Sequence, residues 1–343
     1  MKNSLLVAAG LSVLFAASAG AQANTCPNGT SSNPFGTIVV PDRSRASQDA
    51  CQMAVDVFQF MAPQLGLALA GGNATLGAGS TLGGLGHFSV GIRGNVFNGD
   101  LPQIGSFPTP GTNGRTQREL PSKGQVLGLP TADAAIGLFG GLPFGLTNVG
   151  GVDVLVSAAY IPSFGDSTSD VKVTPDQNFQ IGYGVRVGLL SESIVVPGVS
   201  VTYIKRDLPK TSLSGKSTNL DVNITNAKVE TSAWRITASK SFLLFGVVVG
   251  GGQDKYKEGA SIQATSRGTA AGTQVSDVVQ LAQDLTRTNI FADLSLNLPL
   301  FKIVGEVGNS TGSSGSVITY NTFQTGPADK SRTYGSVGIR IGI

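Results

Sequence analysis

Few side chains in this 343-residue chain could carry out catalytic chemistry. It contains one His, His87, and two Cys, Cys26 and Cys51. Nucleophilic and acid–base catalysis need a base held close to a nucleophile, and structural or catalytic metals need several His, Cys or carboxylate ligands. No Ser-His-Asp arrangement, metal-ligand cluster or pair of carboxylates with a nearby base can be assembled. We therefore expect no catalytic residues, no metal site and no cofactor.

The charged residues are sparse and occur singly. Only 13% of the chain is charged, and its net charge of +3 comes from scattered Lys and Arg without a basic run. Binding to nucleic acid normally needs a clustered basic face. We expect no nucleic-acid partner, and look instead for elements that would bring these isolated charges together.

Ten stretches alternate apolar and polar residues with the two-residue period of a strand. In residues 179–190, for example, Phe179, Ile181 and Tyr183 oppose Gln180 and Gly182. The polar face consists largely of Gly, Ser, Asn and single charges, which suits a crowded polar interior better than a solvent-facing surface. The predicted strands are 84–97, 131–141, 151–161, 177–190, 198–208, 227–241, 243–257, 286–298, 300–309 and 331–343.

Residues 1–23 have the features of a signal peptide. Lys2 supplies the positive charge, residues 5–17 form a short apolar run, and Ala21-Gln22-Ala23 is a cleavage site, with cleavage after Ala21 as the alternative. We expect no membrane-spanning helix after it. An exported chain without such a helix is either a soluble protein or a β-barrel, because in lipid only helices and closed barrels satisfy the backbone hydrogen bonds.

The intervals between the predicted strands favour the barrel. Long intervals rich in Gly, Pro, Ser and Thr alternate with short ones, as extracellular loops alternate with periplasmic turns in outer-membrane barrels. We predict an all-β fold: an antiparallel, transmembrane up-and-down barrel of about ten strands, with 8–14 as the range, over residues 84–343. The expected location is the bacterial outer membrane, with its lipid as one partner and the carboxyl terminus in the periplasm.

The final eight residues, SVGIRIGI, resemble the signal that the outer-membrane assembly machinery reads in the last strand of its clients. Ser336, Gly338, Ile341 and Ile343 occupy the four specified positions. The departure is Ile343, where Phe is commonest. The resemblance implies that the barrel assembly machinery is a partner of this chain.

The N-terminal part, residues 24–83, has a different character. Two Cys in an exported chain are expected to pair, so Cys26 and Cys51 predict a disulfide, with two free thiols as the alternative. Apolar residues at helical spacing predict a helix over 46–62 that Pro63 ends. A glycine-rich segment, 64–86, follows.

This helix and glycine-rich segment are predicted to form a plug in or beneath the barrel. The alternative is a helix on the periplasmic rim with a flexible linker. In outline, an N-terminal plug before a barrel resembles the hydrophobic-compound transporters of the fatty-acid-transporter class. Residues 62–66, Ala-Pro-Gln-Leu-Gly, also resemble a segment that precedes the first strand in uncharacterised outer-membrane barrels.

The interior charges are the candidate functional residues. Because unpaired buried charges are costly, we expect salt-bridged ladders; alternatively, Arg93, Arg186 and Arg340 form a constriction that selects anionic or amphiphilic solutes. The predicted inward positions are Arg93, Asp133, Asp153, Arg186, Arg235, Asp293, Lys302, Glu306 and Arg340. Trp234, Tyr160, Tyr203, Phe242, Phe301 and Tyr334 are predicted to lie in aromatic girdles.

Around ten strands leave a narrow lumen. We therefore expect a narrow channel or transporter for small or amphiphilic solutes, and the alternative is a structural or adhesive barrel. A barrel enzyme is less favoured. The barrel proteases and phospholipases use a His near the outer rim, whereas His87 falls at the periplasmic start of the first predicted strand.

Overall fold

The structure is a computed structural model that describes residue 26 and residues 41–163, 165, 171–268, 272–312 and 317–342. The predicted signal peptide and Ile343 lie outside the described residues.

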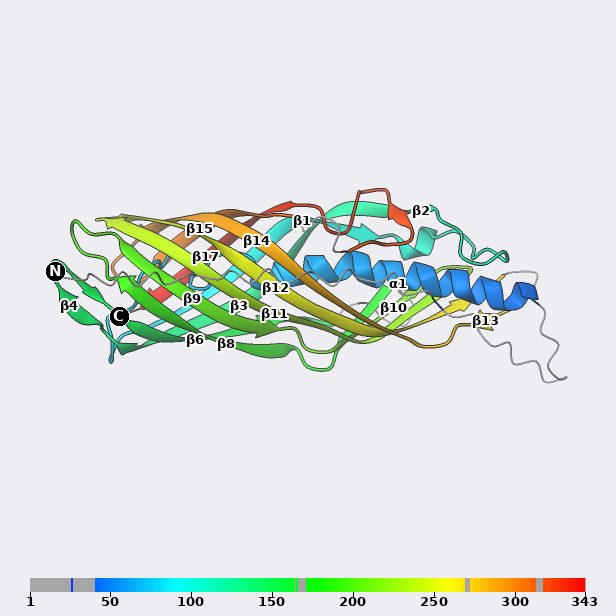
Figure 1. Cartoon of the computed structure of the whole chain (residues 1–343), viewed down its shortest axis with the longest axis horizontal. Coiled ribbons are helices and arrows are strands. Elements are labelled where there is room, and N and C mark those ends of the chain that lie inside the picture. Colours follow the sequence, from blue (N-terminus) through cyan, green and yellow to red (C-terminus); the bar gives the residue numbers. More distant parts are fainter. Residues whose placement is uncertain are drawn as a thin grey trace, which may run out of the picture.

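Ten antiparallel strands form a closed ring in the described part of the chain (Figure 1). Each strand pairs with the next in sequence, and the last pairs with the first, so that Ser89 lies opposite Gly342. The ring consists of β1 (Phe88–Pro102), β3 (Ser122–Phe139), β6 (Val152–Tyr160), β8 (Phe179–Leu190), β9 (Gly198–Asp207), β11 (Leu220–Phe242), β12 (Phe245–Ser266), β14 (Val279–Asn297), β15 (Lys302–Ser310) and β17 (Arg332–Gly342). The predicted barrel fold is confirmed. The first strand begins at Phe88 rather than at residue 84, and several strands are longer than predicted.

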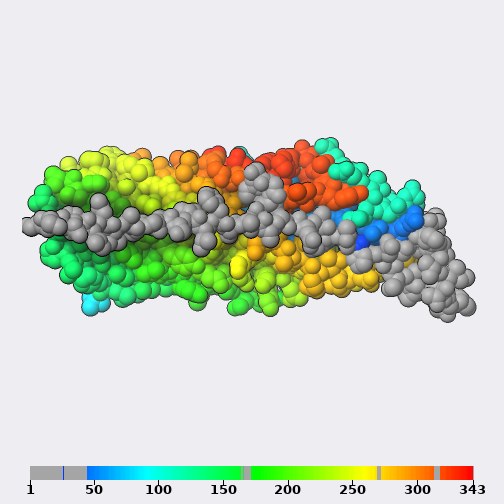
Figure 2. Space-filling view, viewed as in Figure 1, coloured from blue at the N-terminus to red at the C-terminus, as the bar shows by residue number. Residues whose placement is uncertain are grey.

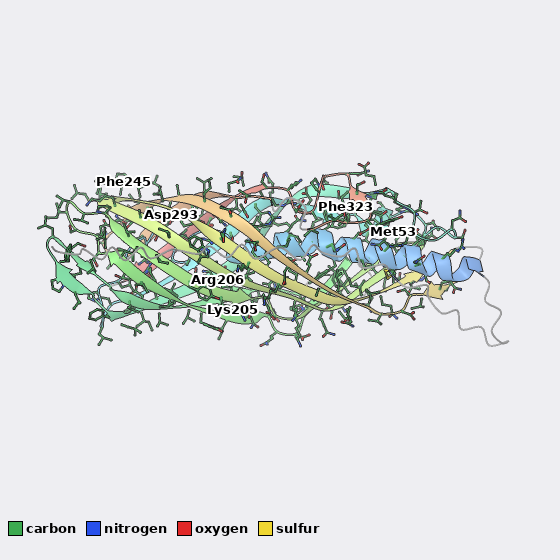
Figure 3. All side chains as sticks on the ribbon, viewed as in Figure 1. Met53, Lys205, Arg206, Phe245, Asp293 and Phe323 are labelled. Atoms are coloured by element: carbon green, nitrogen blue, oxygen red, sulfur yellow. A yellow bond between two sulfur atoms is a disulfide. The ribbon has the colours of Figure 1, made fainter. Side chains whose placement is uncertain are left out.

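The polar faces of the strands point into the ring and the apolar faces point out. In β9, Lys205 lies on the outside and the next residue, Arg206, is buried inside (Figure 3). Outward side chains such as Ile92, Ile181 and Val337 are about two-thirds exposed, at 67%, 66% and 66%. This arrangement is inverted relative to a soluble protein, and it leaves a continuous apolar belt around the ring.

Aromatic residues lie at both edges of the belt. Trp234 and Tyr203 are paired across β11 and β9 at one edge, and Phe242 and Phe245 face each other at the other edge. Tyr160 and Phe301 are half-exposed, in keeping with the prediction. The prediction for Tyr334 is wrong: its ring is 3% exposed, because it shares the inward parity of Ser336, which places it in the lumen.

The connections give the ring two different ends. At one end, called here the short-turn end, the connections are 140–151, 191–197, 243–244 and 298–301; the first contains the small hairpin β4 (Leu142–Phe144) and β5 (Thr147–Val149). At the other, the long-loop end, they are 103–121, 161–178, 208–219, 267–278 and 311–331. Three of the four connections at the short-turn end are shorter than every connection at the long-loop end, as predicted, whereas 140–151 is as long as 208–219.

The wall continues past the belt at the long-loop end. β11 and β12 pair from Phe242 and Phe245 at the short turn out to Leu220 and Ser266, and β10 (Thr211–Lys216), β7 (Val171–Pro175) and β13 (Gln274–Val275) are added at the edges. The 103–121 loop contributes η1 (Ile104–Ser106) and β2 (Glu119–Leu120), and β2 pairs in parallel with β16 (Thr322–Phe323). Figure 2 shows residues around β16 lying beside the 103–121 loop and the helix. We call this part of the molecule the extension.

Helix α1 (Pro41–Ala70) runs inside the extension toward the belt (Figure 1). The predicted end at Pro63 is wrong, since the helix continues for seven further residues. Contacts with the surrounding wall offset the hydrogen bond that Pro63 removes, and the Gln64 side chain bonds both to the Phe60 carbonyl and to the Asp100 carbonyl of β1. The predicted disulfide between Cys26 and Cys51 is present.

Nearly all described side chains of the helix are buried or half-buried, apart from Arg45 and Leu65. Met53 and Phe60 lie in an apolar core with wall residues such as Ile262, and the supposedly polar face, represented by Gln52 and Gln59, is equally buried. One stretch, Arg45–Ala70, is long and apolar enough to cross a membrane by length and composition. Its burial within the wall identifies it as a core helix, which the sequence analysis did not foresee.

Candidate functional site: a charged lumen filled by the N-terminal segment

The glycine-rich segment after the helix passes down the lumen. Residues 71–87, called here the plug segment, lead from the end of α1 inside the ring to the start of β1 at the short-turn end. Gly72 and Gly77 have φ angles of +86° and +70°. A Cβ on Gly72 would lie 2.0 Å from a carboxylate oxygen of Glu306, and one on Gly77 would lie 2.6 Å from Val304. Glycine is required here because the backbone approaches the wall so closely.

A cation from the wall holds the junction between helix and plug segment. Arg235 of β11 donates to the carbonyl oxygens of Ala70 and Gly72 at 3.0 and 3.1 Å, and its guanidinium lies 2.6 Å from the Asp254 carboxylate. A cation at a helix C-terminus satisfies carbonyls that have no partner within the helix. Asp254, on an adjacent strand, balances the charge of Arg235.

A second group of charges holds the middle of the plug segment. Asp133 pairs with Arg93 at 2.9 Å and with Arg206 at 3.3 Å. The same two guanidinium groups donate to the carbonyl oxygens of Asn73 and Ala74. One carboxylate thus positions two cations that bind successive plug carbonyls.

Two carboxylates face the plug segment from neighbouring strands. Asp293 and Glu306 are directly opposite in the β14–β15 ladder. Glu306 accepts from the backbone N–H of Asn73 at 2.6 Å, and Asp293 accepts from the Asn73 side chain at 2.8 Å and the Gly77 N–H at 2.9 Å. Like charges directly opposite destabilise a sheet by themselves. Here N–H groups of the plug segment donate to both carboxylates, and these bonds offset a repulsion that the strand pair alone would not relieve.

Near the short-turn end, Asp153 and Arg186 form a fully buried pair. Their side chains are 0% and 1% exposed, and Arg186 donates to one Asp153 oxygen through Nε at 2.9 Å and Nη2 at 2.7 Å. The Leu82 N–H of the plug segment also bonds to the Asp153 carboxylate. This pair therefore joins β6, β8 and the plug segment.

All nine predicted inward residues have the inward parity, and seven of them take part in these contacts; the other two are Lys302 and Arg340. Sequence reasoning missed Arg206, Asp254 and Asn73. Arg206 and Asp254 lie in predicted strands and have the inward parity, so the two-residue period was the signal that could have found them. Nothing in the sequence marks Asn73, because its role depends on the path of the plug segment.

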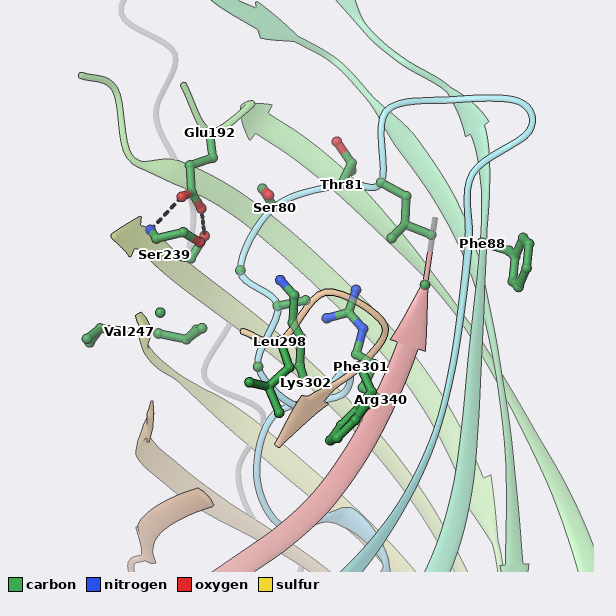
Figure 4. A pocket seen from close by; sticks show the side chains of 18 of the residues that line it. Ser80, Thr81, Phe88, Glu192, Ser239, Val247, Leu298, Phe301, Lys302 and Arg340 are labelled. Atoms are coloured by element: carbon green, nitrogen blue, oxygen red, sulfur yellow. Dashed lines mark hydrogen bonds between the residues drawn. The ribbon is translucent and has the colours of Figure 1, made fainter. Parts of the chain in front are cut away.

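A cavity of about 270 Å³ lies beside residues 77–82 of the plug segment at the short-turn end (Figure 4). Its lining includes plug residues 77–82, the 298–301 turn, Glu192, Lys302 and Arg340. Glu192 accepts hydrogen bonds from the Ser239 hydroxyl and the Ser241 N–H. Lys302 and Arg340 are directly opposite in the β15–β17 ladder and share the inward face.

One carboxyl outside the belt is also held in an unusual environment. Burial raises the pKa of Asp56, in α1, to about 6. It accepts from the N–H groups of Tyr320 and Asn321 and from the Asn321 side chain, which favour its charged form. Asp56 thereby ties the helix to the 311–331 loop.

Three residues of the predicted assembly signal, Ser336, Gly338 and Ile341, lie on the last strand. Ser336 and Gly338 face the lumen, where Ser336 donates to Glu306, and Ile341 is 57% exposed on the outer belt. Ile343 lies outside the described residues. Recognition by the assembly machinery stays a prediction. Among the described residues, no group of three His, Cys, Asp or Glu side chains could hold a metal.

No family model matches the sequence, and no curated protein is significantly similar to it. Solved structures with a similar architecture include the translocator domain of the autotransporter NalP from Neisseria meningitidis, at 9% identity and a TM-score of 0.40, covering 75% of this chain and 87% of that one. The Pseudomonas putida toluene transporter TodX has 11% identity and a TM-score of 0.31, covering 79% and 97%. Ail, the attachment invasion locus protein of Yersinia pestis, has 9% identity and a TM-score of 0.22, covering 76% and 99%. These proteins have different activities, and at these identities none of them assigns a solute to this chain.

Proposed function

We propose that this chain is a bacterial outer-membrane barrel that passes small or amphiphilic solutes through a lumen gated by its own N-terminal segment. The apolar belt with aromatic edges supports the location, because a closed ring satisfies its backbone hydrogen bonds in lipid. By the usual orientation of such barrels, the short-turn end faces the periplasm and the extension faces outward. Lipid surrounds the belt, and the assembly machinery reads residues 336–343.

The observation that carries the proposal is how the plug segment is held. Much of its attachment consists of hydrogen bonds from charged wall groups to plug backbone atoms, as at Arg93, Arg206, Asp293 and Glu306. Because a charged group takes part in each of these bonds, exchanging one for water or a polar solute costs about 1.5–3 kcal/mol, which a series of compensating contacts can offset. A lumen filled by wall side chains of its own would have no equivalent movable part.

A reversible lock tests the gating. A Cβ on Gly188 of β8 would lie 3.5 Å from the Thr81 Cβ, which is at the lower end of the roughly 3.5–4.5 Å that a disulfide spans. The variant Thr81→Cys/Gly188→Cys should conduct in planar bilayers when reduced and lose the current when oxidised. The single variants and the unchanged protein, each with and without reductant, control for reduction of the Cys26–Cys51 bridge. A current that the oxidised lock leaves unchanged would contradict gating by this segment.

A structural or adhesive barrel is the second candidate, and the extension favours it. Outside the belt, α1, the 103–121 loop and the 311–331 loop share one apolar core that includes Phe60, Phe107 and Phe323. A rigid projection of this kind would present a fixed binding surface outside the membrane. If the unchanged protein conducts no solute and cells that display it adhere to surfaces more than cells without it, this candidate is preferred.

We propose no catalytic role. His87 precedes β1 at the short-turn end, where the expected barrel orientation puts the periplasm rather than the outer rim. The place of His87 agrees with the expectation from sequence. The lack of catalytic activity stays a prediction, which assays of the purified barrel for protease and phospholipase activity would test.

A further inference from the structure

The cavity at the short-turn end contains two cations, Lys302 and Arg340, that have no carboxylate at ion-pair distance among the described residues. Lys302 of β15 and Arg340 of β17 are direct cross-strand neighbours on the inward face. Like charges in this position repel each other, and the repulsion weakens the pairing of the two strands. A barrel selected for stability alone would place a carboxylate or a neutral residue at one of the two positions.

Most other cations of the lumen are arranged differently, although Arg287, which is 1% exposed, bonds to the Thr311 and Lys330 carbonyls and has no carboxylate at ion-pair distance among the described residues. Arg93, Arg186 and Arg235 each have a carboxylate oxygen at 2.9, 2.7 and 2.6 Å. Among the described residues, no carboxylate lies within ion-pair distance of Lys302 or Arg340; the neighbour that Arg340 bonds is the Ser89 hydroxyl. The contrast with Arg93, Arg186 and Arg235 indicates that Lys302 and Arg340 have a role other than stabilising the wall.

The one described carboxylate that lines the cavity, Glu192, forms no ion pair with either cation. Glu192 comes from the 191–197 turn and is occupied by the Ser239 hydroxyl and the Ser241 N–H. Figure 4 shows the Lys302 and Arg340 side chains within the cavity and the hydrogen-bonded Glu192 and Ser239 at another part of its wall. Among the described residues that line the cavity, two cations and one carboxylate leave a net positive charge.

The volume of the cavity fits a small ligand. About 270 Å³ is close to the lower end of the roughly 300–1,000 Å³ typical of ligand sites. Hydroxyl groups of Ser80 and Ser239 line it together with apolar residues such as Leu298 and Phe301. A guanidinium and an ammonium side by side are suited to an oxyanion, because the first can donate two parallel hydrogen bonds and the second supplies a compact charge.

We propose that this cavity is a binding site for a compact oxyanion, a phosphate or carboxylate group, held between Lys302 and Arg340. The oxyanion belongs either to a free solute or to the headgroup of an anionic lipid at the adjacent membrane surface. The inference deepens the proposed function, since it gives the chemical class of a solute, but binding at this site does not depend on conduction.

Calorimetric titration of the full chain in neutral detergent tests the proposal. Inorganic phosphate is added against a chloride background of constant ionic strength, and short-chain phosphatidylglycerol is compared with phosphatidylcholine in parallel. Saturable binding of phosphate, or of phosphatidylglycerol in preference to phosphatidylcholine, is the expected result, and which of the two binds identifies the source of the oxyanion. If neither phosphate nor phosphatidylglycerol binds in this way, the proposal is overturned.

Variants assign the binding to the two cations. Lys302→Gln and Arg340→Gln should each weaken binding by about tenfold or more, since a hydrogen bond to a charged group is worth that much. Lys302→Arg should retain it. Lys255→Gln, an exposed position of β12 outside the belt, is the matched control and should bind normally. Saturable binding that survives in Lys302→Gln/Arg340→Gln would show an adventitious ion only, and would overturn the site.

Folding and function are separated from binding in the same preparations. A compact band that shifts on boiling shows that each variant retains the barrel, and removal of like charges should not weaken it. If Lys302→Gln/Arg340→Gln fails to fold, the single variants and Lys302→Arg decide. A protein that binds phosphate but never conducts would contradict the proposed channel and leave this site standing; a conducting protein without saturable oxyanion binding would do the reverse.

Discussion

The buried pair Asp153–Arg186 offers a quantitative test of how the lumen is built. Arg186→Met would leave the Asp153 carboxylate, which is 0% exposed, with the Leu82 N–H as its remaining donor. Removing one partner of a buried ion pair typically costs about 3–5 kcal/mol, because the other charge stays buried without compensation. That is a large part of the roughly 5–15 kcal/mol that stabilises an ordinary domain.

Two controls separate this cost from a general loss of packing. Arg186→Met/Asp153→Leu removes both charges, and should recover most of the stability apart from about 1 kcal/mol for the lost bond to Leu82. Lys205→Met breaks the pair with Asp207 on the outer surface of β9, where the charges are 3.6 Å apart and 37% and 27% exposed. An exposed pair of this kind is worth about 0–1 kcal/mol.

Urea unfolding in phospholipid vesicles measures these differences. Trp234, the one Trp of the chain, lies 40% exposed at the edge of the belt, so its fluorescence should report the transfer from lipid to water. The free energy of unfolding should be highest for the unchanged protein, and should then decrease in the order Lys205→Met, Arg186→Met/Asp153→Leu and Arg186→Met. A loss below about 1 kcal/mol for Arg186→Met, or a double variant as unstable as the single one, would refute the view that charge pairing holds the lumen together.

Three further predictions concern the extension and the belt. Because the folded pKa of Asp56 is raised to about 6, above its unfolded value, the folded state binds the extra proton; stability should fall as pH rises from about 4 to 6, by up to roughly 3 kcal/mol, and Asp56→Asn should flatten that slope in urea unfolding. Replacing Cys26 and Cys51 by Ser removes a bridge across 25 residues, worth about 3 kcal/mol in the chain-entropy model; amide exchange should quicken in α1, whereas an unchanged rate would exclude a stabilising role. Val185→Arg, in the middle of the belt, should cost about 2–4 kcal/mol in vesicles, whereas the same change at Val278, which is 54% exposed outside the belt, should cost little; equal costs would contradict the position of the membrane.

Local patterns in the sequence were enough to predict the ten strands. The two-residue period is a property of the extended backbone, so it also assigned Arg93, Asp153 and Asp293 to the inner face. The spacing of the strands predicted the alternation of short and long connections. The prediction for Tyr334 failed because the preference of aromatic side chains for the membrane edge was given more weight than the two-residue period, which places Tyr334 inside.

The helix was predicted less well, because its surroundings decide its length. In an isolated helix Pro63 is a strong stop signal, and Gln52 and Asp56 mark a solvent-facing side. Inside the extension, the wall and the 311–331 loop cover most of the helix, and supply the Asp100 carbonyl and Asn321 as partners for its polar groups. Neither partner is close in sequence.

The alternation of residues along each strand is enough to predict which side chains lie inside the ring, whereas the partner of each inward charge depends on the tertiary structure. The partner of an inward charge is set by the register of neighbouring strands and by the path of the plug segment. Both depend on many contacts between residues that are far apart in the sequence. Asp153 therefore lies opposite Arg186, while Lys302 lies opposite Arg340. One arrangement stabilises the wall and the other leaves positive charge facing a cavity, although the two-residue period that places all four residues inside is the same.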